Sequence, residues 1–204
     1  SAASDVYKRQ AQFMAMRALR EVGEFTRVWD DVQLARRAAQ LAEEIEAGVT
    51  QYGIVDGHFA YEVDGLGSVL QMDDANMPSL LSLPLTSDLR ADDPLHLATR
   101  AWVLGDANPY LYRGPAACGV GSPHSPAGYV WHIGLAVQGL TGDETEARSC
   151  LETILATDGG TGWTHESFDP ADPTWFTRPW FSWSNSMACL LMMKVAGLDP
   201  LTGA

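Results

Sequence analysis

FMAMRALREVGEFTRVWDDVQLARRAAQLAEEI, residues 13–45, predicts two consecutive helices joined by a short acidic turn. Apolar residues recur at helical spacing in both halves of this stretch. They are Phe13, Met16, Leu19, Val22 and Phe25 in the first half, and Leu34, Ala38, Leu41 and Ile45 in the second. Asp30 or Asp31 can cap the second helix, and Gly48 and Gly53 bracket its end.

The same periodicity predicts further helices at about 76–83, 93–104, 127–140, 143–156 and 182–196. Between the first two helices and these, residues 57–71 (GHFAYEVDGLGSVLQ) alternate apolar and polar around Asp64-Gly65, which predicts a β-hairpin. Helices in consecutive pairs are typical of stacked helical hairpins arranged as a ring or solenoid. Strands and helices do not alternate along the chain, so the expected class is all-α.

Composition and charge narrow the kinds of ligand. The chain has 204 residues, of which 46% are hydrophobic and 19% charged, so it can build a core. A formal charge of −13 argues against nucleic acid as a partner, because phosphate backbones are bound mainly by Lys and Arg. A neutral ligand such as a sugar fits better. No run of about 18 apolar residues is present, so no membrane-spanning helix and no membrane partner are expected.

Two features concern the compartment and the start of the chain. Cys118, Cys150 and Cys189 form neither a CxxC pair nor a disulfide framework, so we expect three buried thiols in a reducing compartment, which favours the cytoplasm over secretion. Residues 1–10, SAASDVYKRQ, have no initiator Met and no apolar signal core. We interpret them as a non-native leader, and residues 11–204 as the C-terminal part of one domain.

The segment TGWTHESFDPADPTWFTRPWFSWSN, residues 161–185, is too broken by prolines for one helix and too aromatic for an ordinary surface loop. Glu166 lies among its aromatic side chains, where a desolvated carboxylate suits proton transfer near neutral pH. The alternative is a structural ion pair between Glu166 and Arg178. The tryptophans of the segment either belong to the core or act as platforms on which pyranose rings stack.

Two other loops carry polar side chains with an open role. Asp73 and Asp74 can cap a following helix, or accept hydrogen bonds from the hydroxyls of a ligand. His124 lies between prolines in GSPHSP, residues 121–126, and is either structural or a donor to a ligand oxygen. The five histidines have no metal-binding spacing, and Met77 stands where a DDxxD magnesium motif needs an acid, so we expect no metal.

Several long motifs in one order resemble glycoside hydrolase family 125. They are FAYEVDGLGSVL, MDDANMPSLLSLP, NPYLYRG, GVGSPHSPAGYVWHIGLAVQGLT and GTGWTHESFDPADPTWFTRPWFSWSNS, and the similarity runs from about Ala11 to Gly197. The resemblance implies an (α/α)6 toroid of helical hairpins, of which this chain would form about half the ring, with a small β-hairpin insertion. It also implies inverting, exo-acting α-1,6-mannosidase activity on mannose-containing oligosaccharides, without metal or other cofactor.

Carried over residue by residue, the resemblance makes Glu166 the general base. We expect the sugar pocket to be lined by Asp64, Asp73, Asp74, Asn76, His124, Trp131, His165, Arg178, Trp183 and Asn185. The general acid is expected in a segment ahead of the first helix, where the leader stands; the alternative is that Asp73 or Asp74 is the acid. His132 and Gly134 depart from the pattern, which has a proline and a bulkier residue at these places.

The length leads to a further expectation and to alternative functions. Half a ring leaves apolar helix faces uncovered, so we expect that this chain lacks the N-terminal half of its domain and is inactive alone. The alternative function is a non-catalytic carbohydrate-binding helical module. A metal-dependent enzyme on a helical toroid is a third possibility, disfavoured by the missing acid at position 77.

Overall fold

The computed structural model describes residues 7–198, with every side chain in that range except those of residues 7–9 and 27. The chain divides into two compact units. The N-terminal unit contains residues 7–72 and 83–100, and the C-terminal unit contains residues 73–82 and 101–198. Each unit buries its own set of apolar side chains.

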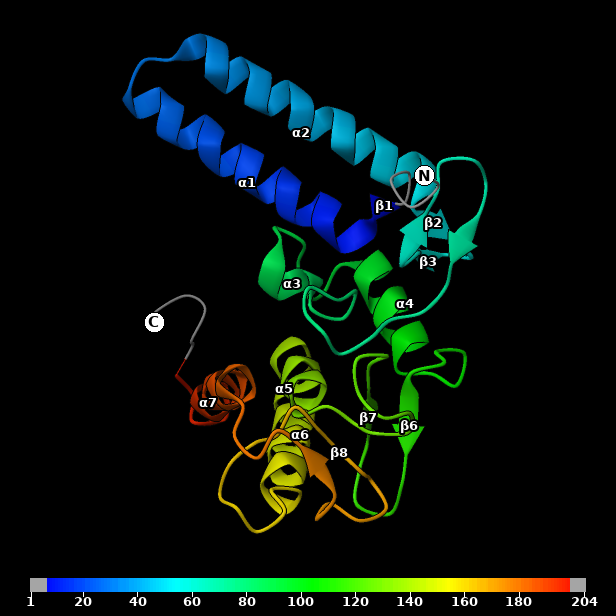
Figure 1. Cartoon of the computed structure of the whole chain (residues 1–204). Coiled ribbons are helices and arrows are strands. Elements are labelled where there is room, and N and C mark those ends of the chain that lie inside the picture. The colour runs from blue at the N-terminus through cyan, green and yellow to red at the C-terminus, as the bar shows by residue number, and fades with distance from the viewer. Residues whose placement is uncertain (1–6, 199–204) are drawn as a thin grey trace. The chain divides into compact units, whose positions relative to one another are not determined.

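The N-terminal unit is built on the predicted pair of helices. α1 (Arg9–Val28) and α2 (Val32–Tyr52) lie side by side and antiparallel (Figure 1). Asp31 is the N-cap of α2, because its side chain accepts a hydrogen bond of 3.0 Å from the backbone N–H of Leu34. Gly53 is the C-cap of α2. The turn and both ends of α2 are therefore as the sequence predicts.

The apolar stripe of this hairpin is only partly buried. Phe13 and Met16 are in the core, and the ring of Phe13 packs edge-to-face on Phe59 with centroids 5.0 Å apart. Val22, Phe25 and Leu34, which were expected in the stripe, are exposed instead. Helical spacing predicts which residues share one face of a helix, but not whether another element packs on that face. These three residues lie on the half of the hairpin near its turn.

Short strands extend the N-terminal unit. β4 (Glu62–Val63) and β5 (Val69–Leu70) form the predicted hairpin, and Asp64 organises its loop by accepting hydrogen bonds from the backbone N–H groups of Leu66 and Ser68. β1 (Tyr7–Lys8) pairs with β4, so the folded chain includes four of the ten residues interpreted as a leader; residues 1–6 lie outside the described residues. β2 (Ile54–Val55) and β3 (His58–Phe59) form a second hairpin that was not expected. Its signal is Asp56-Gly57, both with positive φ.

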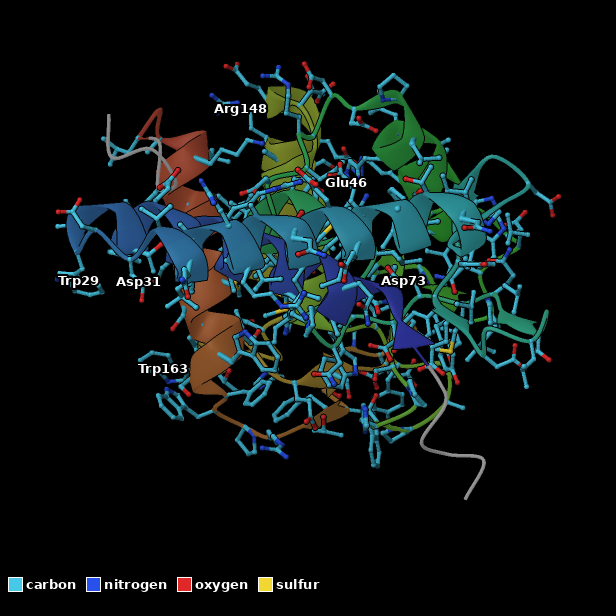
Figure 2. All side chains as sticks on the ribbon, turned by 90° about the horizontal axis from the view of Figure 1, so that it is seen from above. Trp29, Asp31, Glu46, Asp73, Arg148 and Trp163 are labelled. Carbon is cyan, nitrogen blue, oxygen red and sulfur yellow. The ribbon has the colours of Figure 1, made fainter. Side chains whose placement is uncertain are left out.

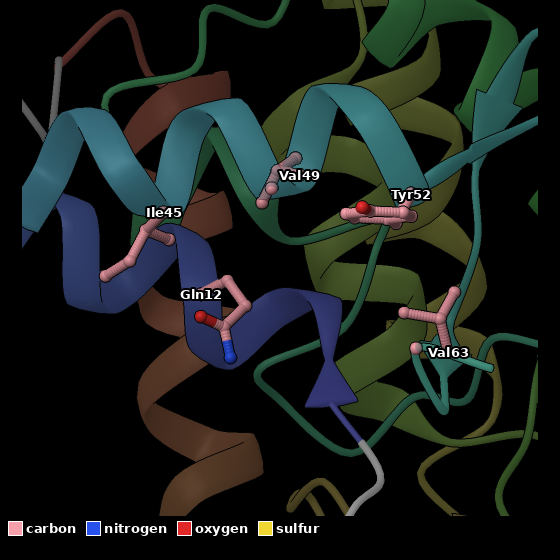
Figure 3. Close-up of a pocket in the computed structure, with 7 residues that line it drawn as sticks. Gln12, Ile45, Val49, Tyr52 and Val63 are labelled. Carbon is pink, nitrogen blue, oxygen red and sulfur yellow. The ribbon is translucent and has the colours of Figure 1, made fainter.

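A cavity of about 250 Å³ lies within this unit, between α2 and β4 (Figure 3). Its lining is largely apolar and includes Ile45, Val49, Tyr52 and Val63, with Gln12 of α1 at one side. Such a lining is poor in the hydrogen-bonding groups that sugar hydroxyls require.

The helix expected at residues 76–83 is wrong. Residues 76–82 form turns, and only α3 (Leu83–Thr86) is helical, followed by α4 (Pro94–Val103) close to its expected place. Side chains compete with helical hydrogen bonds in this segment. Asp74 accepts from the backbone N–H of Asn76 at 2.7 Å, and Ser82 Oγ accepts from the backbone N–H of Ser79 at 2.8 Å.

Three helices form the core of the C-terminal unit: α5 (His132–Thr141), α6 (Glu144–Ala156) and α7 (Ser182–Val195). α5 packs against both α6 and α7 (Figure 1). Lys194 Nζ caps α5 by donating to the carbonyl oxygens of Gly139, Leu140 and Gly142. α5 begins later than expected, because Val130 exchanges two backbone hydrogen bonds of 2.9 Å with Phe168 and so remains extended.

Two small strand pairs complete this unit. β6 (Leu111–Arg113) pairs with β7 (Cys118–Val120), and β8 (Ser167–Phe168) pairs with β9 (Phe176–Thr177). The expectation of three buried thiols is wrong for Cys118 and Cys189, which are exposed; Cys150 is buried. Across residues 7–198, no helix combines the length and apolar character needed to cross a membrane.

Candidate active site

Glu166 lies directly before β8, and Arg178 directly after β9. Because the register pairs Ser167 with Thr177, these two residues stand opposite each other at the open end of the hairpin. Arg178 Nε lies 3.0 Å from Glu166 Oε1, and Thr177 Oγ1 donates to Oε2 at 3.1 Å. The ion pair that the sequence left open is therefore formed. The carboxylate side chain is 13% exposed and its arginine partner 61%, so the pair lies at the surface rather than in a dry interior.

His165 is fully buried next to Glu166. Its ring stacks on Phe176 with centroids 3.7 Å apart and an interplanar angle of 4°. Nδ1 lies 3.2 Å from the carbonyl oxygen of Arg178, and Nε2 lies 2.9 Å from that of Asp158. Both ring nitrogens thus lie next to backbone carbonyl oxygens, one in the chain before Glu166 and one in the chain after β9. The ring, predicted as a sugar-binding group, orders the segment that carries Glu166.

His132, the first residue of α5, supports the same segment and was not predicted as a site residue. Its Nδ1 accepts a hydrogen bond of 2.9 Å from the backbone N–H of His165, so the proton of the neutral ring is on Nε2, 2.9 Å from Thr157 Oγ1. Burial, and next the proximity of His165, lower the pKa of His132 to about 3. The ring is therefore neutral over the ordinary pH range.

Asn185 of α7 fixes the other side of the loop. Its Oδ1 accepts from the backbone N–H of Thr164 at 3.2 Å, and its Nδ2 donates to the carbonyl oxygen of Phe181 at 2.9 Å. Asn185 thus holds the residue that precedes His165, whereas His165, Arg178 and Glu166 are joined by direct contacts. The guanidinium of Arg178 also lies over the ring of Phe181, 5.1 Å from its centroid.

Four tryptophan side chains of the same segment are exposed: those of Trp163, Trp175, Trp180 and Trp183. Figure 2 shows Trp163 at the outer edge of the C-terminal unit, near the start of α7. Their exposure excludes the reading in which these tryptophans form the core. Trp131, also predicted to bind sugar, is buried, with its indole N–H donating to Ser125 Oγ at 2.7 Å.

The remaining residues that the sequence predicts for the site are Asp64, Asp73, Asp74, Asn76 and His124. Asp73 is fully buried, and its two carboxylate oxygens accept from the backbone N–H groups of Leu80 and Leu81 at 2.8 and 3.0 Å. Burial raises the pKa of Asp73 to about 8, although these two hydrogen bonds act in the opposite direction. Asp73 thus holds the backbone of the loop that follows it; the helix that it could have capped is not formed at residues 76–82.

Asp74 is likewise buried and holds the backbone of Asn76, which is partly exposed. His124 is exposed, with its backbone N–H donating to Ser122 Oγ at 3.3 Å. Asp64 belongs to the N-terminal unit and binds its own loop. The structure therefore joins His165, Glu166 and Arg178 by direct contacts, whereas Asp64, Asp73 and Asp74 bind the backbone of their own loops.

Comparison with known proteins gives a consistent result. The sequence model of the metal-independent α-mannosidases, glycoside hydrolase family 125, matches residues 5–193. The Meiotically up-regulated gene 157 protein of Schizosaccharomyces pombe is 43% identical over 174 residues, which are 82% of this chain and 34% of that protein.

Solved structures extend this result. A metal-independent α-mannosidase from Streptococcus pneumoniae, in a non-productive complex with α-1,6-mannobiose, matches with a TM-score of 0.89 and 39% identity, over 94% of this chain and 47% of its own. A glycosidase with 21% identity matches with a TM-score of 0.64 over 94% of this chain and 53% of its own, which supports the fold alone. The expected six-hairpin helical fold is thereby confirmed. The chain spans about a third of the curated relative and about half of the solved ones.

Proposed function

The chain belongs to glycoside hydrolase family 125, the metal-independent α-mannosidases, and from this premise we propose that Glu166 is the general base in the inverting hydrolysis of terminal α-1,6-linked mannose. The observation that carries the proposal is the setting of this carboxylate. It lies at the surface, with each oxygen held by a donor of fixed position, Arg178 Nε or Thr177 Oγ1. A base must be oriented before it accepts a proton from water.

An inverting mechanism needs two carboxyl groups. One protonates the glycosidic oxygen, while the other, about 6.5–9.5 Å away, deprotonates a water on the opposite face of the sugar. We infer that Glu166 has the second role and that the acid comes from a part of the family domain that residues 7–198 do not supply. The solved mannosidase relative is about twice as long as this chain, which is consistent with such a division. On this inference the chain alone does not turn over substrate.

The segment that carries Glu166 has side chains that fit a neutral sugar. The exposed indoles of Trp163, Trp175, Trp180 and Trp183 present flat apolar faces, on which the C–H face of a pyranose can stack. The formal charge of −13 has no counterpart in a mannoside, and none is needed for recognition through stacking and hydroxyl hydrogen bonds. The proposed partners are a mannose-containing oligosaccharide and the N-terminal half of a family domain, with no nucleic acid.

The test compares this chain with a version extended at its N-terminus by the N-terminal half of a family domain. Both are assayed on α-1,6-mannobiose, and the anomer released is read by NMR. We expect turnover, with inversion, only from the extended version, and we expect Glu166→Gln to lower kcat of that version by at least a thousandfold. Glu152→Gln, at an exposed position on α6, is the matched control.

Two results would contradict the proposal. Equal turnover by both chains would overturn the inference about the acid, and full activity of the Glu166→Gln variant would overturn the assignment of the base. Sugar binding without turnover by either chain would instead support the carbohydrate-binding module, for which the exposed indoles are also suited.

A further inference from the structure

The peptide between Thr164 and His165, directly before Glu166, is fixed by a side chain from a distant part of the sequence. His132 Nδ1 accepts the backbone N–H of His165 at 2.9 Å, across 33 residues. Its Nε2 is 2.9 Å from Thr157 Oγ1, which follows α6 directly and itself donates to the carbonyl oxygen of Thr153 at 2.8 Å. The imidazole therefore ties the residue before Glu166 to the start of α5 and the end of α6.

The same ring also contacts the strand that follows Glu166. It stacks on Phe168 of β8 with centroids 4.5 Å apart and an interplanar angle of 25°. Phe168 is fixed in turn by its two backbone hydrogen bonds with Val130. His132 thus holds the chain on both sides of Glu166, at residues 165 and 168, and a short segment held at both ends has little freedom to rotate.

We propose that His132 is a positioning residue for Glu166: its Nδ1 acceptor sets the orientation of the peptide between Thr164 and His165, and its ring packs on Phe168, so that the backbone on both sides of Glu166, and thereby the direction of the carboxylate, is fixed. This rests on the proposed function of Glu166 as the base. His132 is 1% exposed, so it reaches neither solvent nor substrate and acts only through the backbone. Orientation of a base by groups behind it is a common requirement of acid–base catalysis.

Neutrality of the ring is part of this arrangement. A protonated imidazole has no acceptor on Nδ1, and the backbone N–H of His165 would then lose its partner. The titratable groups close to the ring are His165 and Asp158. Burial of the ring and the proximity of His165 lower the pKa of His132, and they outweigh Asp158, which raises it. The acceptor is therefore present at every pH at which a mannosidase would be assayed.

Two substitutions separate the acceptor from the rest of the ring. The side-chain oxygen of Asn can occupy the place of Nδ1, so His132→Asn keeps an acceptor for the N–H of His165. The amide of Gln reaches the place of Nε2, so His132→Gln keeps the contact with Thr157 and loses the acceptor. Both lose the stacking on Phe168 equally, which makes each variant the control for the other.

The experiment uses the N-terminally extended protein and measures kcat, KM and the hydrogen exchange of the His165 amide. For His132→Gln we expect exchange at least tenfold faster and kcat at least tenfold lower, with KM changed by less than threefold. For His132→Asn we expect both rates within threefold of the parent. Glu152→Gln, at an exposed position on α6, should change neither.

Three outcomes would overturn the positioning role. In the first, the His132→Gln variant shows faster exchange but unchanged kcat. In the second, the Asn and Gln variants lose kcat equally, because ring packing alone would then matter. In the third, His165 exchange is unchanged in both, because the hydrogen bond would then be absent. Failure of the base assignment is recognised separately, since Glu166→Gln would retain turnover while His165 exchange still reports on the hydrogen bond.

Discussion

Arg178 Nε lies 3.0 Å from Glu166 Oε1, and the arginine that makes this contact has a left-handed backbone with φ of 51°. This conformation costs a residue with a Cβ about 1–2 kcal/mol. The same backbone directs the carbonyl oxygen of Arg178 to His165 Nδ1 at 3.2 Å. A strained residue thus serves both the ring before Glu166 and the carboxylate itself.

The strain at Arg178 can be separated from its ion pair. Arg178→Ala and Arg178→Gly both remove the guanidinium, but only glycine adopts a positive φ at little steric cost. We expect the glycine variant to be more stable than the alanine variant by about 1 kcal/mol, even though glycine makes the unfolded chain more flexible. Chemical denaturation of the two proteins measures the difference. Equal stability would mean that the positive φ is not maintained in solution.

Asp73 predicts an unusual pH dependence of stability. Its pKa is raised to about 8 by burial, whereas an unfolded Asp titrates near 3.8, so between these values the folded state binds more protons than the unfolded state. The contribution of Asp73 to the free energy of unfolding is therefore greatest below about pH 4 and falls as pH rises toward 8. The slope is at most about 1.4 kcal/mol per pH unit.

Asp73→Asn removes this titration while keeping one acceptor for the loop. The stability of the parent minus that of the variant, measured by denaturation at several pH values between 5 and 8, is expected to decrease with increasing pH. Asp64→Asn, at a carboxylate in an exposed loop, provides a control that should not share this trend. Parallel curves for the parent and the Asp73→Asn variant would show that the two backbone donors at Leu80 and Leu81 outweigh the burial of Asp73.

The sequence predicted best what local interactions determine. The α1–α2 hairpin follows from helical spacing and the capping side chain of Asp31, both of which act within a few residues. Residues 76–82 were predicted as helix because their apolar spacing is helical. They fold as turns because Asp73 accepts from Leu80 and Leu81, seven and eight residues away, a choice that periodicity does not encode.

The residues of the candidate site also differ in how well the sequence predicts them. Glu166 and Arg178 were identified from one segment, and the alternative of an ion pair followed from their proximity in sequence. The role of His132 was missed, since it depends on a contact across 33 residues and the residue was noted only as a departure from the family pattern. Exposure of Val22 and Phe25 was missed for a related reason, because a helical stripe does not show which surface covers it.

Trp183 is predicted to contribute to sugar binding more than to folding. It is partly exposed in the first turn of α7, with its ring 6.2 Å from that of Phe181. Trp183→Ala should weaken the binding of α-1,6-mannobiose about tenfold, which corresponds to about 1.4 kcal/mol, and lower the free energy of unfolding by about 1 kcal/mol. Calorimetric titration measures the affinity. Trp29→Ala, at an exposed tryptophan of the N-terminal unit, is the control, and an equal loss of affinity there would argue against a specific stacking site.

Two helical glycines should respond to alanine in opposite directions. Neither Gly48 nor Gly134 has a positive φ, so alanine gains about 0.5–1 kcal/mol of helix propensity at each position. A Cβ on Gly48 of α2 meets nothing within 4 Å, so Gly48→Ala should raise the thermal midpoint. A Cβ on Gly134 of α5 would lie 2.9 Å from the carbonyl oxygen of Val120 and 3.0 Å from Ala75 Cβ. Because the backbone around Gly134 cannot easily move, Gly134→Ala should lower the free energy of unfolding by about 1–3 kcal/mol despite its gain in helix propensity.

Thermal denaturation of the two variants tests this difference between the glycines. If the Gly134→Ala variant were as stable as its parent, the loop carrying Ala75 and the end of β7 would be free to move away from α5. The close approach at this glycine would then not constrain the C-terminal unit.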